Sequence, residues 1–281
     1  MLKVGPCFWP LQFVSSFGTL SPHMTNKILG ENSTEVKSNY GVTIDDLFTA
    51  GAHFGFSKSR RNPSVKQYIF GTKNRMDIID LEKSLTTFDR ALAYMEQLSK
   101  DGKQILLAGN KKEARPYIIE AAEKIDMPYV AERWIGGTLT NFAEIRKRIA
   151  RLEDLLSKKE TGGLNIYTKK ERTLLDKEMA DLTKHFGGIV KMKRLPAAVF
   201  VVDSGKEEIA VAEAKKLGIP VISLSGSDCN ISEINYPVIG NDSSITSIKY
   251  FVDKLVQVWR NTKSLNPAVT GISLAPAMTV K

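Results

Sequence analysis

Short, almost wholly apolar runs alternate with amphipathic segments through the middle of this chain. The clearest run extends from Ala197 to Val202, where every residue is apolar. A strand of this kind must be covered on both faces, as strands are in a parallel sheet flanked by helices. The segment 207–217 has the pattern of a covering helix, which Gly218 and Pro220 then end. The sequence therefore predicts an α/β domain built around a largely parallel sheet.

The same rhythm recurs on either side of this unit. Further strands are expected over 103–108, 128–131 and 221–224, and further helices over 111–125 and from Asp242 or Ser243 to about Arg260. Thr43 and Asp46 have the spacing of a capping box, which predicts another helix beginning there. Gly109 and Gly205 are expected to let the chain turn from strand into helix.

One segment, 143–195, lacks strand patterning and has apolar residues at helical spacing instead. The first apolar seam comprises Ile145, Ile149, Leu152 and Leu156, and the second comprises Leu175, Met179, Leu182 and Phe186. Between the seams, Gly162 and Gly163 offer the positive-φ positions that a chain reversal needs. The segment is therefore predicted to form an antiparallel helical hairpin inserted into the α/β domain.

Positive charge gathers in two segments of the chain. Forty Lys and Arg against thirty-one Asp and Glu give a formal net charge of +9. The segment 143–195 holds fourteen of these cations and eight acids, and the segment 53–83 holds seven cations and three acids. Such clusters are typical of proteins that bind a polyanion, above all a nucleic acid. For any single residue, a solvated helix face is an equally good interpretation.

The candidate RNA-binding residues come from these two segments and from the neighbourhood of Trp134. They are Lys58, Arg60, Arg61, Lys66, Lys73, Arg75, Arg133, Trp134, Asn141, Arg146, Lys147, Arg148, Arg151, Lys158, Lys159, Lys169, Lys170, Arg172, Lys191, Lys193 and Arg194. Trp134 suits either stacking on a base or filling the core, and the core is the commoner place for Trp in a globular domain. Positioning through phosphate contacts, rather than base reading, is expected to dominate.

The sequence mostly fails the tests for a nucleotide-using enzyme. It contains no G-x-G-x-x-G motif, and Ser204-Gly205-Lys206 lacks the rest of a phosphate-binding loop. Asp203 is read as a helix-capping or surface carboxylate, Cys229 as an unreactive thiol, and His53 as a packed, hydrogen-bonded side chain. Two cysteines and three scattered histidines favour neither a disulfide framework nor a zinc site, so no metal site is expected.

The two ends of the chain lack the alternating pattern of its middle. Residues 1–42 are predicted to be a flexible extension, with Met24 as an alternative start, and residues 262–281 a flexible tail. The α/β domain is thus placed at 43–261, with the hairpin inside it. No apolar run is long enough to span a membrane, so no membrane partner is expected.

Motifs across this domain resemble one known family, the bacterial-type small-subunit ribosomal protein two. The first half carries His53-Phe54-Gly55, Asn62-Pro63, Ile69-Phe70-Gly71 with Asn74, Ile78-Ile79, Leu81-Glu82-Lys83, Arg133-Trp134 with Gly136-Gly137, and Leu139-Thr140-Asn141. The second half carries Lys169-Lys170-Glu171, Gly187-Gly188-Ile189, Leu195-Pro196, Leu217-Gly218-Ile219-Pro220-Val221 and Gly240-Asn241-Asp242. These motifs stand in the family's order over residues 43–261.

The resemblance implies a flavodoxin-like domain with a protruding helical hairpin. It also implies a structural, non-catalytic role in translation, on small-subunit rRNA at the solvent side between head and body. The implied partners are this rRNA, neighbouring small-subunit proteins and, where the organism has it, the mRNA-binding ribosomal protein one. No cofactor is implied. The expected location is cytoplasmic and ribosome-bound, and an organellar origin stays open.

The chain departs from the family pattern at three places. Phe56 replaces a histidine, Gly226-Ser227-Asp228 replaces an Asp-Thr-Asn turn, and Ile239 replaces a proline. These departures bear on local loops and on protein-facing surfaces. Two other functional classes compete with the ribosomal interpretation: an α/β enzyme acting on a nucleotide or sugar phosphate, suggested by Gly109 and Gly205, and a protein adaptor that docks through the hairpin.

Overall fold

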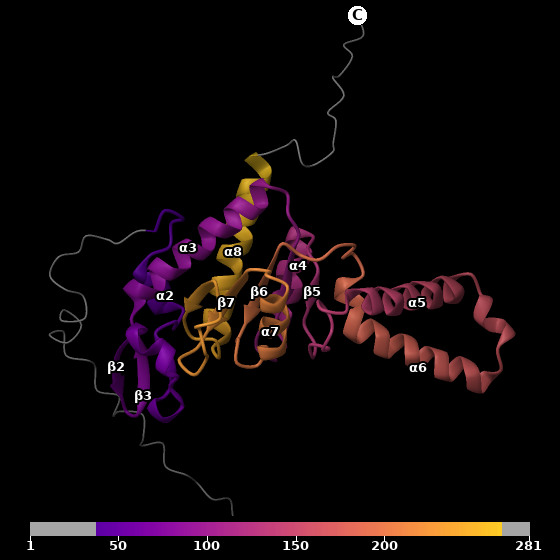
Figure 1. Cartoon of the computed structure of the whole chain (residues 1–281), viewed down its shortest axis with the longest axis horizontal. Helices are drawn as coiled ribbons and strands as arrows, with labels where there is room; N and C mark the ends of the chain where they lie inside the picture. Colours follow the sequence, from indigo (N-terminus) through magenta and orange to yellow (C-terminus); the bar gives the residue numbers. More distant parts are fainter. Residues whose placement is uncertain (1–37, 266–281) are drawn as a thin grey trace, which may run out of the picture. The chain divides into compact units, whose positions relative to one another are not determined.

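A five-stranded parallel sheet organises the structure, a computed structural model that describes residues 38–265 (Figure 1). The strand order is β5-β4-β6-β7-β8, and every neighbouring pair is parallel. The strands are β4 (Ile105–Ala108), β5 (Tyr129–Val130), β6 (Ala198–Val202), β7 (Val221–Ser225) and β8 (Tyr236–Ile239). Every residue of β4, β6 and β7 is buried, which confirms the expectation drawn from the apolar runs.

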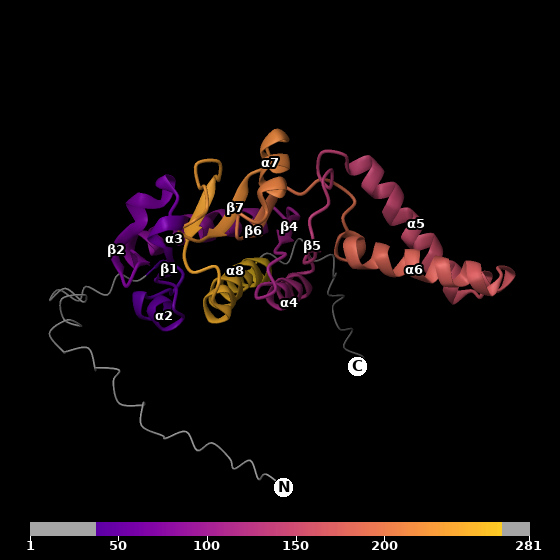
Figure 2. The same ribbon diagram turned by 90° about the horizontal axis from the view of Figure 1, so that it is seen from below.

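Helices cover both faces of this sheet, so the domain has three layers. On one face lie α3 (Leu81–Lys100), α4 (Arg115–Ile125) and α8 (Ile245–Leu265), whose apolar residues join those of alternate strand positions such as Phe200 in one core. On the other face lies α7 (Glu208–Lys216), with the base of the inserted hairpin beside it. Figure 2 shows α7 on the opposite side of the sheet from α4 and α8. The flavodoxin-like α/β prediction is confirmed.

A second, antiparallel sheet precedes this core and was not predicted from the sequence. After α2 (Ile44–Thr49), the chain forms β1 (Phe54–Ser57), two short 3-10 turns, β2 (Ile69–Lys73) and β3 (Met76–Ile79), in the order β1-β3-β2. Glycine and basic residues break the alternation of these strands, and bulges in both pairings shift their register. Helix α3 and strand β8 also went unpredicted, although Asp80 caps α3 through bonds from two backbone N–H groups.

The segment between β5 and β6 forms the predicted helical hairpin. Its helices are α5 (Phe142–Glu160) and α6 (Lys169–Phe186), joined by a short 3-10 turn that Gly162 enters with a φ of 73°. Thr168 and Glu171 cap α6 with reciprocal bonds to the backbone. In Figures 1 and 2 both helices extend away from the layered sheet beyond β5.

The apolar seam of the hairpin differs from the prediction at one position. Leu152, Leu155 and Met179 form a small separate core, whereas Leu156 is exposed. Residues three and four positions beyond Leu152 flank the same helix face on either side. The side on which α6 packs decides whether Leu155 or Leu156 is buried, and here it is Leu155.

Three element boundaries also correct the sequence-based expectations. Helix α4 begins at Arg115 and not at Lys111, because Pro116 needs a place in the first turn, where its missing N–H costs nothing. Helix α8 begins at Ile245, and Asp242 is buried beneath its start instead of capping it. The same helix continues to Leu265, past the predicted domain end at 261.

The predicted N-terminal boundary also moves. Val42 is completely buried and Ser38 bonds to Asp89, so residues 38–42 belong to the packed domain. Thr43 and Asp46 form the predicted capping box of α2. The expectations for residues 1–37 and 266–281 lie outside the described residues.

The revised seam gives a testable pair of substitutions. Leu155→Ala should destabilise the hairpin by about 2–3 kcal/mol, because it leaves a cavity in the small core that Leu152, Leu155 and Met179 form between α5 and α6. Leu156→Ala should change the stability by less than about 1 kcal/mol, since its side chain is already exposed. Amide hydrogen exchange across 142–186 measures both, and equal effects of the two variants would contradict the seam.

Candidate nucleic-acid interface

The root of the hairpin is held by one buried carboxylate, Glu213 of α7. Its Oε1 accepts from the backbone N–H of Gly137 at 2.7 Å, and its Oε2 accepts from those of Leu139 and Thr140 at 2.9 and 3.1 Å. The Trp134 indole N–H and the Thr140 hydroxyl also donate to this carboxylate. Burial alone would raise the pKa of Glu213, but these backbone donors outweigh it and lower the pKa. The loop 134–140 therefore has a fixed, charged anchor.

The structure decides whether Trp134 stacks on a base or fills the core. The side chain is only 4% exposed and packs in the core on the α7 face of the sheet. Its ring is therefore not available to stack on a base, and Trp134 leaves the set of candidate RNA contacts. The neighbouring Arg133 and Asn141 are exposed and stay in it.

Glu213 is not among the residues predicted from the sequence, although a signal was present. Glu213 lies three residues after Ala210 and next to Ala214, on the helix face that buries both alanines. A charged residue on the apolar face of an amphipathic helix needs buried partners. The pattern could thus have indicated a polar anchor, but not which loop it holds.

Near the antiparallel sheet, the basic residues divide into structural and free cations. Arg61 donates hydrogen bonds from Nε and Nη2 to the buried Asp77 carboxylate, and this pairing lowers the pKa of Asp77. Arg60 lies 3.4 Å from Asp228 and over the ring of Phe56. Arg61 therefore stabilises the sheet, and its charge is already neutralised.

The remaining cations of this region have no acidic partner among residues 38–265. They are Lys58, Lys66, Lys73 and Arg75, and all are exposed. Asn74 and Arg75 form the tight turn between β2 and β3 with φ values of 52° and 63°. This conformation normally favours glycine, so the chain presents a charged side chain at the tip of the turn at some conformational cost.

The hairpin cations divide in the same way. Four of them pair with acids on the hairpin itself: Lys147 with Glu144, Arg151 with Glu178, Lys158 with Asp154, and Lys159 with Asp176. Lys191 pairs with Asp126, and Arg146 reaches the carbonyls of Val190 and Met192 at 3.5 Å. The exposed candidates without an acidic partner in the described residues are Arg148, Lys169, Lys170, Arg172, Lys193 and Arg194.

The two basic groups are not brought together. The hairpin follows β5 at one edge of the parallel sheet, and the turn after α6 contacts that strand. The antiparallel sheet lies instead against the loop after β7, where the Ser227 hydroxyl accepts from the Phe56 N–H. Just before β1, the Ala52 carbonyl accepts from the Asn241 N–H in the loop after β8. Both views show the two groups beyond opposite edges of the parallel sheet (Figures 1 and 2). A single short RNA segment cannot serve both groups.

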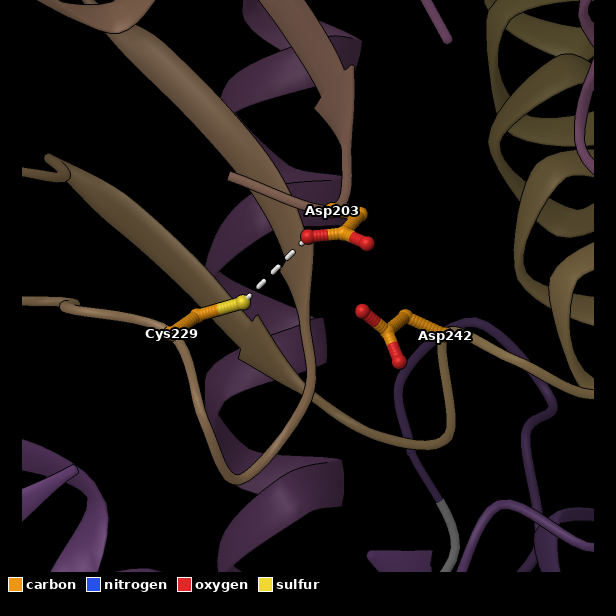
Figure 3. A group of neighbouring side chains, drawn as sticks. All are labelled: Asp203, Cys229 and Asp242. Carbon is orange, nitrogen blue, oxygen red and sulfur yellow. Dashed lines mark hydrogen bonds between the residues drawn. The ribbon is translucent and has the colours of Figure 1, made fainter. Parts of the chain in front are cut away.

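The carboxyl ends of the parallel strands, where α/β enzymes bind ligands, hold a buried ionic cluster. Asp203 after β6 and Asp242 after β8 face each other, with Cys229 beside Asp203 (Figure 3). Their ligand atoms lie within 4.8 Å of one another, as a metal site requires. However, the Lys111 ammonium lies 3.1 Å from Asp203 and 3.4 Å from Asp242. The chain itself thus supplies the cation that these carboxylates need.

Phe56 and Gly226 fill the rest of this edge. A side-chain carbon on Gly226 would lie 2.8 Å from Asp242 and 3.0 Å from the Phe56 ring, so only glycine fits there. Phe56 also faces the Lys111 ammonium at 5.7 Å. Two of the three departures from the family pattern therefore meet in one packed cluster.

Burial strongly shifts the titration of this cluster. It raises the pKa of Asp242 to about 7, with the charge of Asp203 adding to the effect. Burial also raises the pKa of Glu207 to about 7; one Glu207 oxygen accepts from the Asn110 N–H, and the other has no partner among the described residues. Burial by itself lowers the pKa of Lys111, but the charges of Asp242 and Asp203 outweigh it, so its pKa is raised.

The other singled-out residues have structural surroundings. Asp203 is buried and paired with Lys111, so its interpretation as a surface carboxylate was wrong. Its Oδ1 also accepts from the Lys206 N–H in the turn that leads into α7, as a capping carboxylate does. Burial raises the pKa of the Cys229 thiol to about 12, as an unreactive cysteine requires. His53 is packed between Phe48 and Phe54, and burial lowers its pKa, but its Nδ1 finds no hydrogen-bond partner within residues 38–265.

Comparison with known proteins now identifies the family. The family model described as Ribosomal protein S2 matches residues 47–261. The chain belongs to the ribosomal protein S2 family. Its relatives named small ribosomal subunit protein uS2 include one from Mycobacteroides abscessus, 43% identical over 73% of this chain and 74% of the relative. Those from Chlorobaculum tepidum and Helicobacter hepaticus are 42% and 40% identical, over 79% and 80% of this chain and 89% and 85% of each relative.

Membership of the ribosomal protein S2 family decides between the competing classes. The family is structural and not enzymatic, so the prediction that the chain is not an enzyme is confirmed. The match also agrees with the filled edge of the parallel sheet, where Lys111 and Phe56 occupy the place of a ligand. Within residues 38–265, no helix has the length and apolarity needed to cross a membrane.

The anchoring role of Glu213 can be tested with a single change. Glu213→Gln should lower the free energy of unfolding by about 2–3 kcal/mol, because the neutral amide has one acceptor oxygen for three backbone N–H groups. Glu208→Gln on the same helix is the matched control, since Glu208 is exposed. Urea denaturation of both variants is the measurement, and hydrogen exchange should speed up first in 134–140. If Glu213→Gln proved as stable as Glu208→Gln, the anchoring role of Glu213 would be contradicted.

The pH dependence of stability tests the burial of Glu207. Between about pH 4.5 and pH 7 the unfolded chain releases the Glu207 proton while the folded chain keeps it, so stability falls as the pH rises and then levels off. Glu207→Gln should therefore reduce the loss of folding stability between these pH values by up to about 3 kcal/mol. The part of the loss that remains is expected to come from Asp242, whose pKa is also raised. Urea unfolding at several pH values measures it. An unchanged profile would show that Glu207 ionises normally.

Proposed function

We propose that this chain is a structural constituent of the small ribosomal subunit and binds small-subunit rRNA through its basic hairpin and its basic antiparallel sheet. Family membership supports the ribosomal role. The observation that carries the RNA contact is the set of exposed cations without acidic partners in residues 38–265, at the hairpin and at the β2–β3 turn. Such cations can displace counterions from a phosphate backbone.

The separation of the two basic groups supports a bridging position. Because they lie beyond opposite edges of the parallel sheet, they suit two different rRNA segments (Figure 1). This agrees with a place at the junction between the head and the body of the subunit. The described α/β layers then act as a rigid spacer that sets the distance between the two contacts.

Protein partners are proposed for the surfaces that these cations leave free. Neighbouring small-subunit proteins and the mRNA-binding ribosomal protein one are the partners that the family suggests. The proposed location is on ribosomes in the cytoplasm, with an organellar ribosome as the alternative.

Charge neutralisation on the hairpin tests the rRNA contact. Replacing Arg148, Lys169, Lys170 and Arg172 with Gln should weaken incorporation into small subunits and flatten its salt dependence by about one unit of log–log slope for each lost phosphate contact. Sucrose-gradient sedimentation of the tagged chain from cell lysates, over a series of salt washes, measures both effects.

A second quadruple variant controls for net charge. Replacing Lys147, Arg151, Lys158 and Lys159 with Gln removes the same charge, but these residues already pair with hairpin acids. Its effect on the salt slope should therefore be smaller. Wild-type incorporation of the first variant after a high-salt wash would contradict the hairpin contact, and migration of the wild-type chain with free protein would contradict the ribosomal role.

A further inference from the structure

The end of the hairpin lies directly on the backbone of the edge strand β5. The turn η4 (Gly187–Ile189) follows α6 and contacts β5, the outermost strand of the parallel sheet. A side-chain carbon on Gly188 would lie 2.3 Å from the Tyr129 carbonyl oxygen and 2.8 Å from two carbons of the Tyr129 ring. The closest of these atoms belongs to the backbone and cannot turn away. No residue larger than glycine therefore fits at position 188.

The neighbouring glycine has no such constraint. A side-chain carbon on Gly187 would lie 3.6 Å from the Thr183 side chain, which is an ordinary van der Waals distance. Gly187 also has a helical φ of −53°, which any residue can adopt. The φ of Gly188 is not positive either, so its need for glycine is one of space and not of backbone conformation. The two adjacent glycines thus differ only in what lies next to them.

Burial strengthens the attachment as the chain leaves the hairpin. Ile189 and Met192 are 1% and 0% exposed and pack in the core on the α7 face of the sheet. Between them, Lys191 pairs with Asp126 at the end of α4, but both side chains are mostly exposed. Exposed ion pairs contribute little to stability. The close contact of Gly188 and the two buried side chains therefore hold the exit of the hairpin.

The hairpin is thus attached to the domain at two separate points. Glu213 of α7 holds the entry loop, whereas Tyr129 of β5 holds the exit. A body held at one point can rotate about it, and a second point on another element removes most of this freedom. The 19 residues of α5 make a helix about 28 Å long, so a rotation of about 10° at its root would move its far end by about 5 Å. A shift of this size breaks a direct phosphate contact.

We infer that Gly188 is a positioning residue of the hairpin: by letting η4 lie directly on the Tyr129 backbone, it sets the direction in which α5 and α6 leave the domain. The direction is a property of the free chain. Its consequence rests on the proposed function, because a hairpin of altered direction cannot meet one rRNA segment while the antiparallel sheet holds another. An arm fixed before binding also loses little freedom when it binds.

Spin labels on the full chain can measure this direction. One label is placed on α5 through Ser157→Cys, and the other on α7 through Ala212→Cys or on α8 through Gln257→Cys; all three positions are exposed. Cys7→Ser leaves Cys229, which is buried, as the other cysteine. Pulsed electron–electron double resonance then gives two distance distributions, one for each pair of labels.

The two adjacent glycines provide a matched pair of variants. Gly188→Ala should shift the mean of at least one distance by about 3–5 Å, or broaden its distribution by as much, because η4 must move off β5. Gly187→Ala introduces the same methyl group one residue earlier and should keep both wild-type distributions. Tyr129→Ala removes the ring beside Gly188 without creating an overlap, so it should broaden the same distances. It decides the question if Gly188→Ala does not fold.

A further control separates direction from stability. Leu92 of α3 is completely buried in the core on the other face of the sheet. Leu92→Ala should lower the urea midpoint of unfolding, because it leaves a cavity, but should leave both distance distributions unchanged. A role of Gly188 in stability alone would make the two variants behave alike.

The second readout compares RNA binding with incorporation into small subunits. Gly188→Ala keeps every cation, so the salt slope of its binding to a labelled RNA of mixed sequence, measured by fluorescence anisotropy, should equal that of the wild type. Its co-sedimentation with small subunits should nevertheless fall, whereas Gly187→Ala should match the wild type in both measurements. The quadruple hairpin variant that lacks four cations should instead lose salt slope.

Three results would overturn the inference. They are wild-type distances in both Gly188→Ala and Tyr129→Ala, an equal shift in Gly187→Ala and Gly188→Ala, and a shifted distance in Leu92→Ala. Normal incorporation of a Gly188→Ala chain with shifted distances would overturn the link between the direction of the hairpin and its rRNA contact. If the wild-type chain failed to co-sediment with small subunits, the proposed function would fall, while the distances would still decide the role of Gly188.

Discussion

The buried Glu213 carboxylate is the interaction on which the arrangement of this protein most depends. It belongs to the α/β layers, but its partners belong to the loop that leads into the hairpin. Three backbone N–H groups of this partly buried loop converge on one charge. The hairpin therefore leaves the domain from a fixed root, and its cations are presented from that root in a constant direction.

A second ionic cluster performs a comparable task at the carboxyl ends of the parallel strands. Asp203, Asp242 and Lys111 come from the ends of three strands, and their mutual pairing fastens loops that would be mobile around a ligand in an enzyme of this fold. Phe56 arrives from the antiparallel sheet and closes the same space. The fold that often carries catalysis acts here as a rigid support, because its ligand crevice is filled by its own side chains.

Sequence patterns predicted the elements whose signals are local. Fully apolar strands, the two hairpin helices and the capping box at Thr43 all follow from periodicity or spacing within a few residues. The antiparallel sheet was missed because bulges and basic residues break its alternation, and the seam residue Leu155 because positions three and four apart are equivalent within one helix. The basic residues were found, but not which of them already pair with acids.

What the sequence by itself determined is the composition of each element: which strands are buried on both faces, where a helical hairpin interrupts them, and which segments carry excess cations. Only the tertiary structure decided that Trp134 lies in the core, that Arg61 serves Asp77, and that the two basic groups lie beyond opposite edges of the sheet. The physical reason is that burial and ion pairing depend on residues far apart in the chain. Periodicity reports the face of an element, but the partner of that face is set by how all the elements pack.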